Sequence, residues 1–145
     1  MLRALSRLAG VAALLLGAVA HAGADLAPRV PAAEGAAARA LANPLGASSE
    51  QLARGRALYA GKGFCAACHG PSGQGLGSDV DTSKLRGALP RDFTDAAWQA
   101  ARRDGELYWV LANGVPGTAM AAFVPSVLSA EEGWQVLLYV RSLGR

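Results

Sequence analysis

Two cysteines and a histidine stand close together in the segment Cys-Ala-Ala-Cys-His at residues 65–69. Cys65 and Cys68 have the spacing at which two thiols can form thioethers with the vinyl groups of one haem. His69 follows directly, where it can be an axial ligand of the iron. If the segment forms a helical turn, positions i, i+3 and i+4 share one face, so all three side chains can meet one flat macrocycle. The motif therefore predicts covalent attachment of one haem c.

A CxxC pair also occurs in zinc sites and in redox-active dithiols. A structural zinc site needs four ligands, usually with a second Cys or His pair downstream. The sequence has no further cysteine and no histidine after His69. A thioredoxin-like dithiol needs a βαβ context, which the hydrophobic pattern does not show, and a plain disulfide of an exported protein is a further alternative. The histidine directly after the second cysteine favours haem over all three.

Haem iron needs either a sixth ligand or an open position. Of the two methionines, Met1 falls in a segment that we expect to be removed, which leaves Met120 as the candidate distal ligand. It follows Pro116-Gly117, which fits positions i+1 and i+2 of a type II turn. The alternative is a methionine that fills a gap in the core. A thioether ligand raises the reduction potential and fills the coordination sphere, which favours electron transfer over catalysis.

Residues 1–22 have the parts of a secretory signal. Arg3 and Arg7 precede an uncharged apolar run over residues 8–20, and small residues then give a cleavage site after Ala22, with a second pattern two residues earlier. The uncharged run of about 15 to 17 residues is shorter than the roughly 20 that span a bilayer. An uncleaved membrane anchor is therefore the less favoured alternative. We expect an exported protein located in the periplasm.

Length and charge limit the function classes. The sequence has 145 residues, which suggests a single small domain. It has 14 basic and 11 acidic residues, and removal of Arg3 and Arg7 leaves 12 against 11, a net charge of +1. No basic run of the kind that marks nucleic-acid binding is present. The near-neutral charge also gives no strong sign for the surface of a partner.

The hydrophobic pattern predicts an all-α fold, because no alternating strand pattern occurs. Residues 23–47 are rich in alanine and proline and are typical of a linker, in which residues 32–42 could form a short helix. Many glycines make residues 70–92 mostly loop. The remaining residues, 48–145, form the predicted domain. Its helices are expected at residues 48–60, 95–102, 104–113 and 129–143.

Capping residues define the starts of three of these helices. Ser48 with Gln51 has the spacing of a capping box, in which each side chain bonds the other residue's amide. Residues 129–132, Ser-Ala-Glu-Glu, have the same spacing at the last helix. Asp92 or Thr94 is the expected cap of the helix over residues 95–102.

These motifs resemble the class I cytochromes c, particularly the small periplasmic ones of bacteria. The resemblance covers about residues 48–145. It rests on CAACHG at residues 65–70, NGVPGTAM at residues 113–120, a first helix with Gly55 and Tyr59, and a last helix that ends in WQVLLYVRSL. It implies a class I cytochrome c fold, with three to five helices wrapped around one covalent haem.

The resemblance also implies how the terminal helices meet and how the proximal histidine is held. The first and last helices should cross, with Gly55 and Tyr59 against Val136 and Tyr139. In the family, a proline after the haem motif often supplies a carbonyl to the other ring nitrogen of the histidine. Pro71 and Pro90 are the available prolines, but neither has the expected spacing, so that partner is left unassigned. Alanine follows Met120 where proline is common, which loosens the ligand loop slightly.

Other large and charged side chains have structural explanations as well as functional ones. Arg91, with Lys84 and Arg86 nearby, could neutralise a haem propionate, although a solvated charged face is the default. Either Tyr108 or Trp109 could line the haem pocket. Helical spacing favours core positions over an electron relay for the three tryptophans, Trp98, Trp109 and Trp134.

The predicted function is one-electron transfer between transient redox-protein donors and acceptors, by a monomeric carrier that is not an enzyme. The predicted site consists of Cys65 and Cys68 as thioethers, with His69 and Met120 as proximal and distal ligands, and no catalytic residue. The alternative is an electron-transfer subunit of a larger periplasmic dehydrogenase or oxidase complex. A haem enzyme such as a peroxidase would require Met120 to be absent from the iron or readily displaced.

Overall fold

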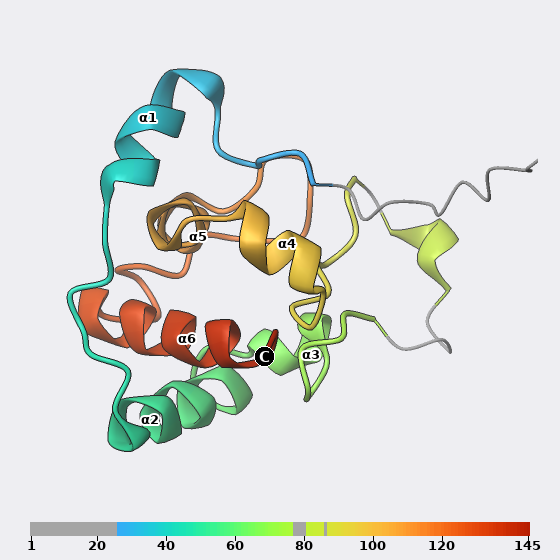
Figure 1. Ribbon diagram of the computed structural model, residues 1–145. Coiled ribbons are helices and arrows are strands. Elements are labelled where there is room, and N and C mark those ends of the chain that lie inside the picture. The colour runs from blue at the N-terminus through green and yellow to red at the C-terminus, as the bar shows by residue number, and fades with distance from the viewer. Residues whose placement is uncertain (1–25, 77–80, 86) are drawn as a thin grey trace, which may run out of the picture.

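The computed structural model describes residues 26–76, 81–85 and 87–145 (Figure 1). The predicted signal over residues 1–22 and its cleavage after Ala22 lie outside these residues. Within them, no helix has both the length and the apolar character that crossing a bilayer requires.

The described residues contain helices and no strand, so the all-α prediction is confirmed. The elements are α1 (Ala32–Ala40), α2 (Ser49–Ala60), α3 (Cys65–His69), the 3₁₀ helix η1 (Thr82–Lys84), α4 (Ala96–Ala101), α5 (Asp104–Asn113) and α6 (Ala130–Ser142). Four α-helices match those expected from the hydrophobic pattern. The residues that the structure describes hold two further α-helices: α1, within the stretch 32–42 where a short helix was considered, and the turn of the CxxCH motif.

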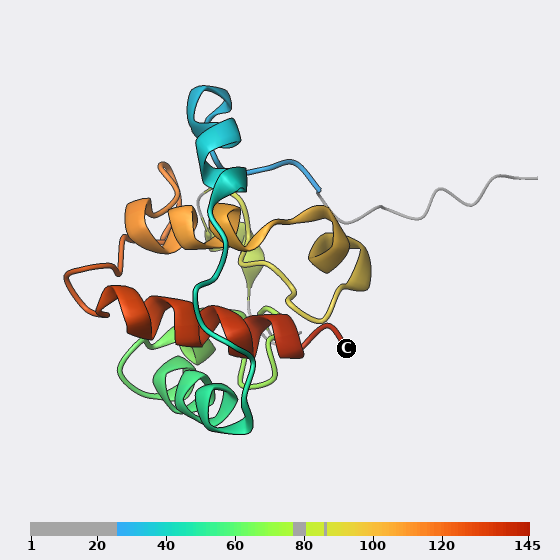
Figure 2. The same cartoon turned by 60° about the vertical axis from the view of Figure 1, so that its left-hand side comes forward.

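The helices stack in a fixed order, which both views show. α6 lies between α5 on one side and α2 on the other, and α1 packs on the far side of α5 (Figures 1 and 2). The core lies where these helices meet, and its most deeply buried side chains are Tyr59, Leu128 and Val136.

The crossing of α2 and α6 is the most extensive contact between helices, as the resemblance implied. A Cβ atom at Gly55 would overlap the backbone carbonyl of Gln135 and lie 3.1 Å from the Cβ atom of Tyr139. The rings of Tyr59 and Tyr139 meet edge to face, with centroids 5.2 Å apart. Gln135, not Val136, lies directly against the glycine.

The two predicted capping boxes differ in outcome. At α6 both halves form, because the Ser129 hydroxyl accepts from the Glu132 amide at 3.2 Å and Glu132 accepts from the Ser129 amide at 2.8 Å. At α2 only the Ser48 half forms, with 3.2 Å between its hydroxyl and the Gln51 amide. The Gln51 side chain instead accepts from the Gln135 side chain of α6 at 2.9 Å. The predicted reciprocal bond at α2 is therefore wrong, because a partner on α6 takes its place.

α4 begins one residue later than predicted and has a different cap. The Asp95 carboxylate accepts from the amides of Ala97 and Trp98, at 2.8 and 3.1 Å. Asp92 accepts from the amide of Thr94 at 2.7 Å and shapes the loop before the helix. The prediction of Asp92 or Thr94 as the cap is therefore wrong.

The described part of the alanine- and proline-rich segment packs against α5. Val30 and Ala38 are buried. A Cβ atom at Gly105 of α5 would overlap the backbone carbonyl of Ala38, so the two helices touch through their backbones. The division of the chain into residues 1–22, 23–47 and 48–145 stays a prediction.

Trp98 and Trp134 lie in the core, as expected. Trp109 does not, because its indole nitrogen donates to the Glu34 carboxylate of α1 at 2.6 Å. Helical spacing alone could not show that α1 covers this face of α5.

Candidate functional site

All four predicted site residues line one cavity of about 610 Å³. Cys65, Cys68 and His69 come from α3, and Met120 comes from the loop between α5 and α6. Most of the wall is apolar, and its large side chains come from the loop before α4, from α4, α5 and α6: Phe93, Trp98, Leu107, Leu111, Val136 and Val140. The fold therefore brings together residues that are 51 positions apart in the sequence, by subtraction of 69 from 120.

Local backbone geometry sets the position of α3. Phe64, the residue before the helix, has a left-handed φ of 51°, and Gly70 ends the helix with a φ of 76°. The left-handed conformation costs a non-glycine residue of order 1 kcal/mol or more and persists only where the surroundings impose it. The hydroxyl of Tyr59 donates to the Gly70 carbonyl at 2.8 Å. The core aromatic of α2 therefore holds the end of the CxxCH turn.

The two cysteines are free thiols. Burial raises the pKa of Cys65 to about 11, and the nearby Cys68 adds a smaller upward effect. The Cys65 thiol is therefore neutral at physiological pH. Within the part of the chain that is described, no group of three or more His, Cys, Asp or Glu side chains gathers as a metal site would need.

His69 is oriented by a backbone carbonyl and an aromatic ring. Its Nδ1 atom lies 3.1 Å from the carbonyl oxygen of Arg91, and its ring stacks on Phe93 at a centroid distance of 4.3 Å. Burial lowers the pKa of His69, so the imidazole is neutral at physiological pH. With the proton on Nδ1 and donated to Arg91, the Nε2 lone pair is free to bind iron.

The Arg91 carbonyl is the partner of His69 that the sequence left unassigned. The residue after Pro90 supplies it, and not Pro71 or Pro90. Pro90 was a nearby signal, but spacing from the motif could not reveal the carbonyl, because Arg91 lies in a stretch, residues 87–95, that belongs to no helix.

The loop that carries Met120 is closed by a set of short-range bonds. The Thr118 amide donates to the Val115 carbonyl at 3.2 Å, and Gly117 has a φ of 77°, which confirms the type II turn. The Thr118 hydroxyl accepts from the Met120 amide at 3.1 Å. The Val115 amide donates to the Met120 carbonyl at 2.8 Å. Thr118 is a positioning residue that the sequence analysis missed.

The aromatic residues proposed for the pocket wall lie elsewhere. Tyr108 stacks on Trp134 with centroids 4.0 Å apart, and Trp109 bonds α1; neither lines the cavity. The prediction that one of them lines it is therefore wrong. Tyr59, Phe93 and Trp98 supply the large rings there instead.

Charged residues occupy one part of the wall. Arg91 lines the cavity, as it must if it is to neutralise a haem propionate. Its Nη2 atom donates to the Ala27 carbonyl at 3.0 Å. Lys84 is exposed, pairs with Asp81 at 3.2 Å and does not line the cavity, while Arg86 lies outside the described residues. Three further charged residues that the sequence did not single out also line it: Arg29, Arg102 and Glu106.

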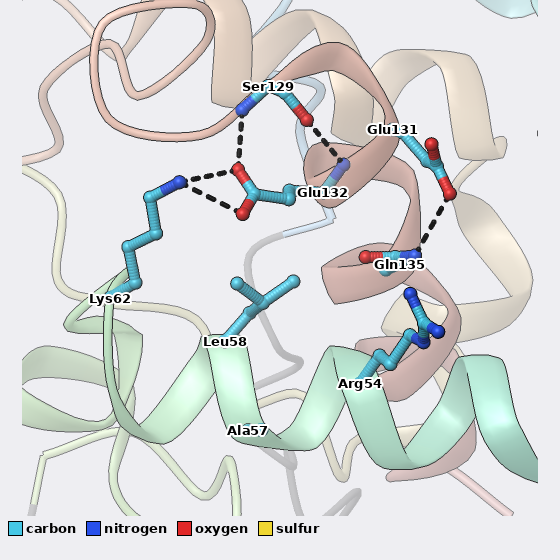
Figure 3. A pocket seen from close by; sticks show the side chains of 8 residues that line it. All are labelled: Arg54, Ala57, Leu58, Lys62, Ser129, Glu131, Glu132 and Gln135. Carbon is cyan, nitrogen blue, oxygen red and sulfur yellow. Dashed lines mark hydrogen bonds and ion pairs between the residues drawn. The ribbon is translucent and has the colours of Figure 1, made fainter.

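A second hollow, of about 590 Å³, lies between α2 and the first half of α6 (Figure 3). It contains none of the predicted site residues. Lys62 donates to both Glu132 oxygens there, at 2.9 and 2.7 Å, which ties the end of α2 to the start of α6 (Figure 3). Its lining residues carry charges of both signs and the hollow is open to solvent, so it does not indicate a specific ligand.

The first cavity fits a covalently held haem in its donor chemistry. It has apolar walls for the macrocycle, two thiols one turn apart, a neutral imidazole with a free Nε2, and a thioether. The roles of Cys65, Cys68, His69 and Met120 as thioethers and ligands stay predictions.

Comparison with known proteins supplies independent information. The sequence profile of the cytochrome c family matches residues 52–144. None of the curated proteins matches the sequence at a significant level.

Several solved structures are similar to this chain, and two of them are described here. A chain of the Kuenenia stuttgartiensis reducing HAO-like protein complex Kustc0457/Kustc0458 is 27% identical, with a TM-score of 0.57 over 70% of this chain and 47% of that chain. The KustC0563 c-type cytochrome is 31% identical, with a TM-score of 0.50 over 63% of this chain and 98% of that chain. The match spans about half the length of the first of these proteins.

Proposed function

This chain belongs to the cytochrome c family, and from that premise we propose that it is an exported carrier of single electrons. Membership implies covalently bound haem c. Cys65 and Cys68 would form its thioethers, with His69 and Met120 as the axial ligands of the iron. The observation that carries the proposal is that one cavity gathers these four side chains while Arg91 engages His69 Nδ1.

The protein residues prepare the site for electron transfer. When bound, the haem supplies an iron that cycles between ferric and ferrous states. His69 is held neutral and oriented by the Arg91 carbonyl, and the Thr118 turn restrains the loop of Met120. Two protein ligands leave no open position for oxygen or peroxide, which favours a carrier over an enzyme.

Exposed apolar residues at the cavity support short-lived encounters with partners. Phe64 is 72% exposed and Leu85 is 42% exposed, and both residues also line the cavity. A small patch of this kind suits the limited interfaces of electron-transfer complexes. The partners are proposed to be redox proteins of the periplasm.

A second candidate function is an electron-transfer subunit of a larger complex. It is favoured by the first structural neighbour, which is a chain of a protein complex. Gel filtration of the protein purified from its native host distinguishes the two. A stable assembly with a second protein supports the subunit, whereas a lone monomer supports the diffusing carrier.

Spectra of the purified holoprotein test the haem and its ligands. Expression with a haem-ligation system should give one covalently bound haem c, and the ferric form should show the weak long-wavelength absorption band of sulfur ligation. Protein without covalent haem would contradict the proposal.

Replacement of the distal ligand provides a second test. M120A should lower the reduction potential and open the iron to added imidazole or cyanide, because the thioether is lost. V127A, which changes an exposed residue that does not line the cavity, is the control. An unchanged potential in M120A would show that another residue is the sixth ligand.

A further inference from the structure

Arg102 is a buried cation in the wall of the cavity, in the turn between α4 and α5. Its side chain is only 10% exposed. One guanidinium nitrogen donates to the Leu26 carbonyl, and Nη1 lies 3.5 Å from the Glu106 carboxylate. Its Nε atom is buried and has no hydrogen-bond partner among the described residues. A buried donor without an acceptor is costly, so this part of the wall lacks an acceptor.

The one carboxylate beside Arg102 is bound more closely by another arginine. Glu106 is 3% exposed, and both its oxygens lie 3.0 Å from Nη1 of Arg39, while the Arg103 amide donates to it at 2.7 Å. The Glu106 carboxylate therefore bonds closely to Arg39, which is 48% exposed, and reaches the more deeply placed Arg102, which is 10% exposed, only at 3.5 Å. The neighbouring Arg141 is already paired with Asp104 at 2.7 Å. Because an uncompensated buried charge is unfavourable, an anion is expected on the cavity side of Arg102.

We propose that Arg102 binds a propionate of the haem. The inference rests on the covalent haem of the proposed function. A propionate is a carboxylate, which accepts hydrogen bonds from a guanidinium group in the geometry that arginine favours. Its charge would balance the Arg102 guanidinium, and it would supply the missing acceptor. The backbone of Arg102 is also fixed, because the Arg141 guanidinium donates to the Arg102 carbonyl at 2.6 Å.

The other cations of the wall are less suited to this role. Arg29 and Arg91 line the same cavity but are half-buried, and they donate to the carbonyls of Leu89 and Ala27, respectively. Arg102 differs from them in having a buried guanidinium nitrogen with no hydrogen-bond partner among the described residues. Its position depends on the N-terminal segment, since Leu26 accepts from its guanidinium and Arg39 shares Glu106. Residues before 52, where the family match begins, therefore contribute to the haem wall.

Redox titration of holoprotein variants tests the proposal. R102Q removes the charge, R102K keeps it, and R56Q removes an equal charge from an exposed position of α2 outside the cavity. Loss of a cation beside the haem favours the ferric form. We expect R102Q to reduce the equilibrium constant for reduction about tenfold, a potential about 59 mV lower for one electron. R102K and R56Q should stay close to the wild type.

The pH profile of the potential separates propionate binding from a structural role. Without the guanidinium, the propionate should protonate at a higher pH, so the potential of R102Q should gain a step between about pH 5 and 8. A potential and a pH profile of R102Q that match those of R56Q would overturn the proposal. So would an R91Q or R29Q variant that gains the step while R102Q does not.

Two further controls keep the outcome decisive. If R102Q yields no folded holoprotein, the E106Q variant is titrated in its place. Loss of this carboxylate increases the positive charge at the cavity wall, so E106Q should have a higher reduction potential. An unchanged potential in E106Q would then overturn the proposal. Wild-type protein without covalent haem would instead refute the proposed function, which the first spectrum shows before any variant is made.

Discussion

Two helix contacts in this protein use the same feature, a glycine that lies against a backbone carbonyl of the neighbouring helix. Gly55 of α2 meets the Gln135 carbonyl of α6, and Gly105 of α5 meets the Ala38 carbonyl of α1. Around Gly55 the contact continues through aromatic rings, as in the pair of Tyr59 with Tyr139. Around Gly105 it continues through polar groups, which join Arg39 to Glu106 and Trp109 to Glu34.

The difference indicates that the α2–α6 contact is part of the domain core, whereas the α1–α5 contact adds a helix to its outside. The α2–α6 crossing includes Tyr59, the most buried ring of the core, and both helices overlap the family match over residues 52–144. α1 lies before that match, and its ion pair with α5 is half-exposed on the Arg39 side. We therefore expect loss of the first contact to unfold the protein and loss of the second to release α1 alone.

The largest effect is expected from Gly55→Ala. The new Cβ atom would overlap the backbone of Gln135, which cannot rotate away, so α2 and α6 must separate. Overpacking of this kind costs about 3 kcal/mol at the upper end of its range. Denaturant unfolding of the holoprotein measures it.

Gly35→Ala in α1 is the matched control. No atom lies within 4 Å of a Cβ atom there, so the substitution should stabilise α1 slightly through helix propensity, by up to about 1 kcal/mol. Unfolding of the Gly55→Ala variant at the wild-type midpoint would show that the crossing is not as close as described.

Gly105→Ala should have an intermediate effect that is local. The added methyl would overlap the Ala38 carbonyl and displace α1, at a cost of about 1–2 kcal/mol, because α1 is free to move away from α5. Hydrogen exchange should show faster exchange of the α1 amides with the α2 and α6 amides unchanged. An equal acceleration in all three helices would mean that the two contacts form one cooperative unit.

Arg39→Gln tests the ionic part of the α1–α5 contact. Glu106 would remain buried with one guanidinium in place of two, but Arg39 is 48% exposed, so solvent screening limits the loss to about 1 kcal/mol. Arg54→Gln is the comparison, because it removes an exposed pair within α2 and should cost less than about 0.5 kcal/mol. Equal losses in the two variants would contradict a special role for the α1 pair.

The smallest effect concerns the exposed Lys62–Glu132 pair, which joins α2 to α6. The hydrogen bond from Lys62 lowers the pKa of Glu132. A carboxylate with a lowered pKa stabilises the folded state above its unfolded pKa, near 4.5, and this contribution is lost as the pH falls through the folded pKa. Glu132→Gln should therefore lower the Tm slightly at pH 7 and progressively less as the medium becomes more acidic. A Tm difference that is the same at every pH would assign the effect to the capping box alone.

Short-range features were predictable because their partners lie within a few residues. The capping box of Ser129 and Glu132, the type II turn before Met120 and the bounds of α5 all formed as the sequence indicated. Asp95 replaced the predicted caps of α4 because several acceptors compete within four residues, and only the backbone geometry selects among them.

Partners from distant elements were not predictable. Gln51 gave up its local bond for Gln135 on α6, and His69 found the Arg91 carbonyl in an irregular loop. Trp109 is covered by α1, a short helix for which the sequence indicated no packing partner. In each case the partner is far away in the sequence, and the hydrophobic periodicity of a helix does not indicate it.

The sequence by itself determined the chemistry of the centre, because the spacing of Cys65, Cys68 and His69 is a property of one helical turn. The tertiary structure decided what surrounds it. Only folding could place Met120 in the same cavity, direct the Arg91 carbonyl to His69, and bury Arg102 beside a carboxylate that Arg39 binds more closely. The physical reason is that burial and charge balance depend on which elements pack together, whereas ligand spacing depends on the local backbone alone.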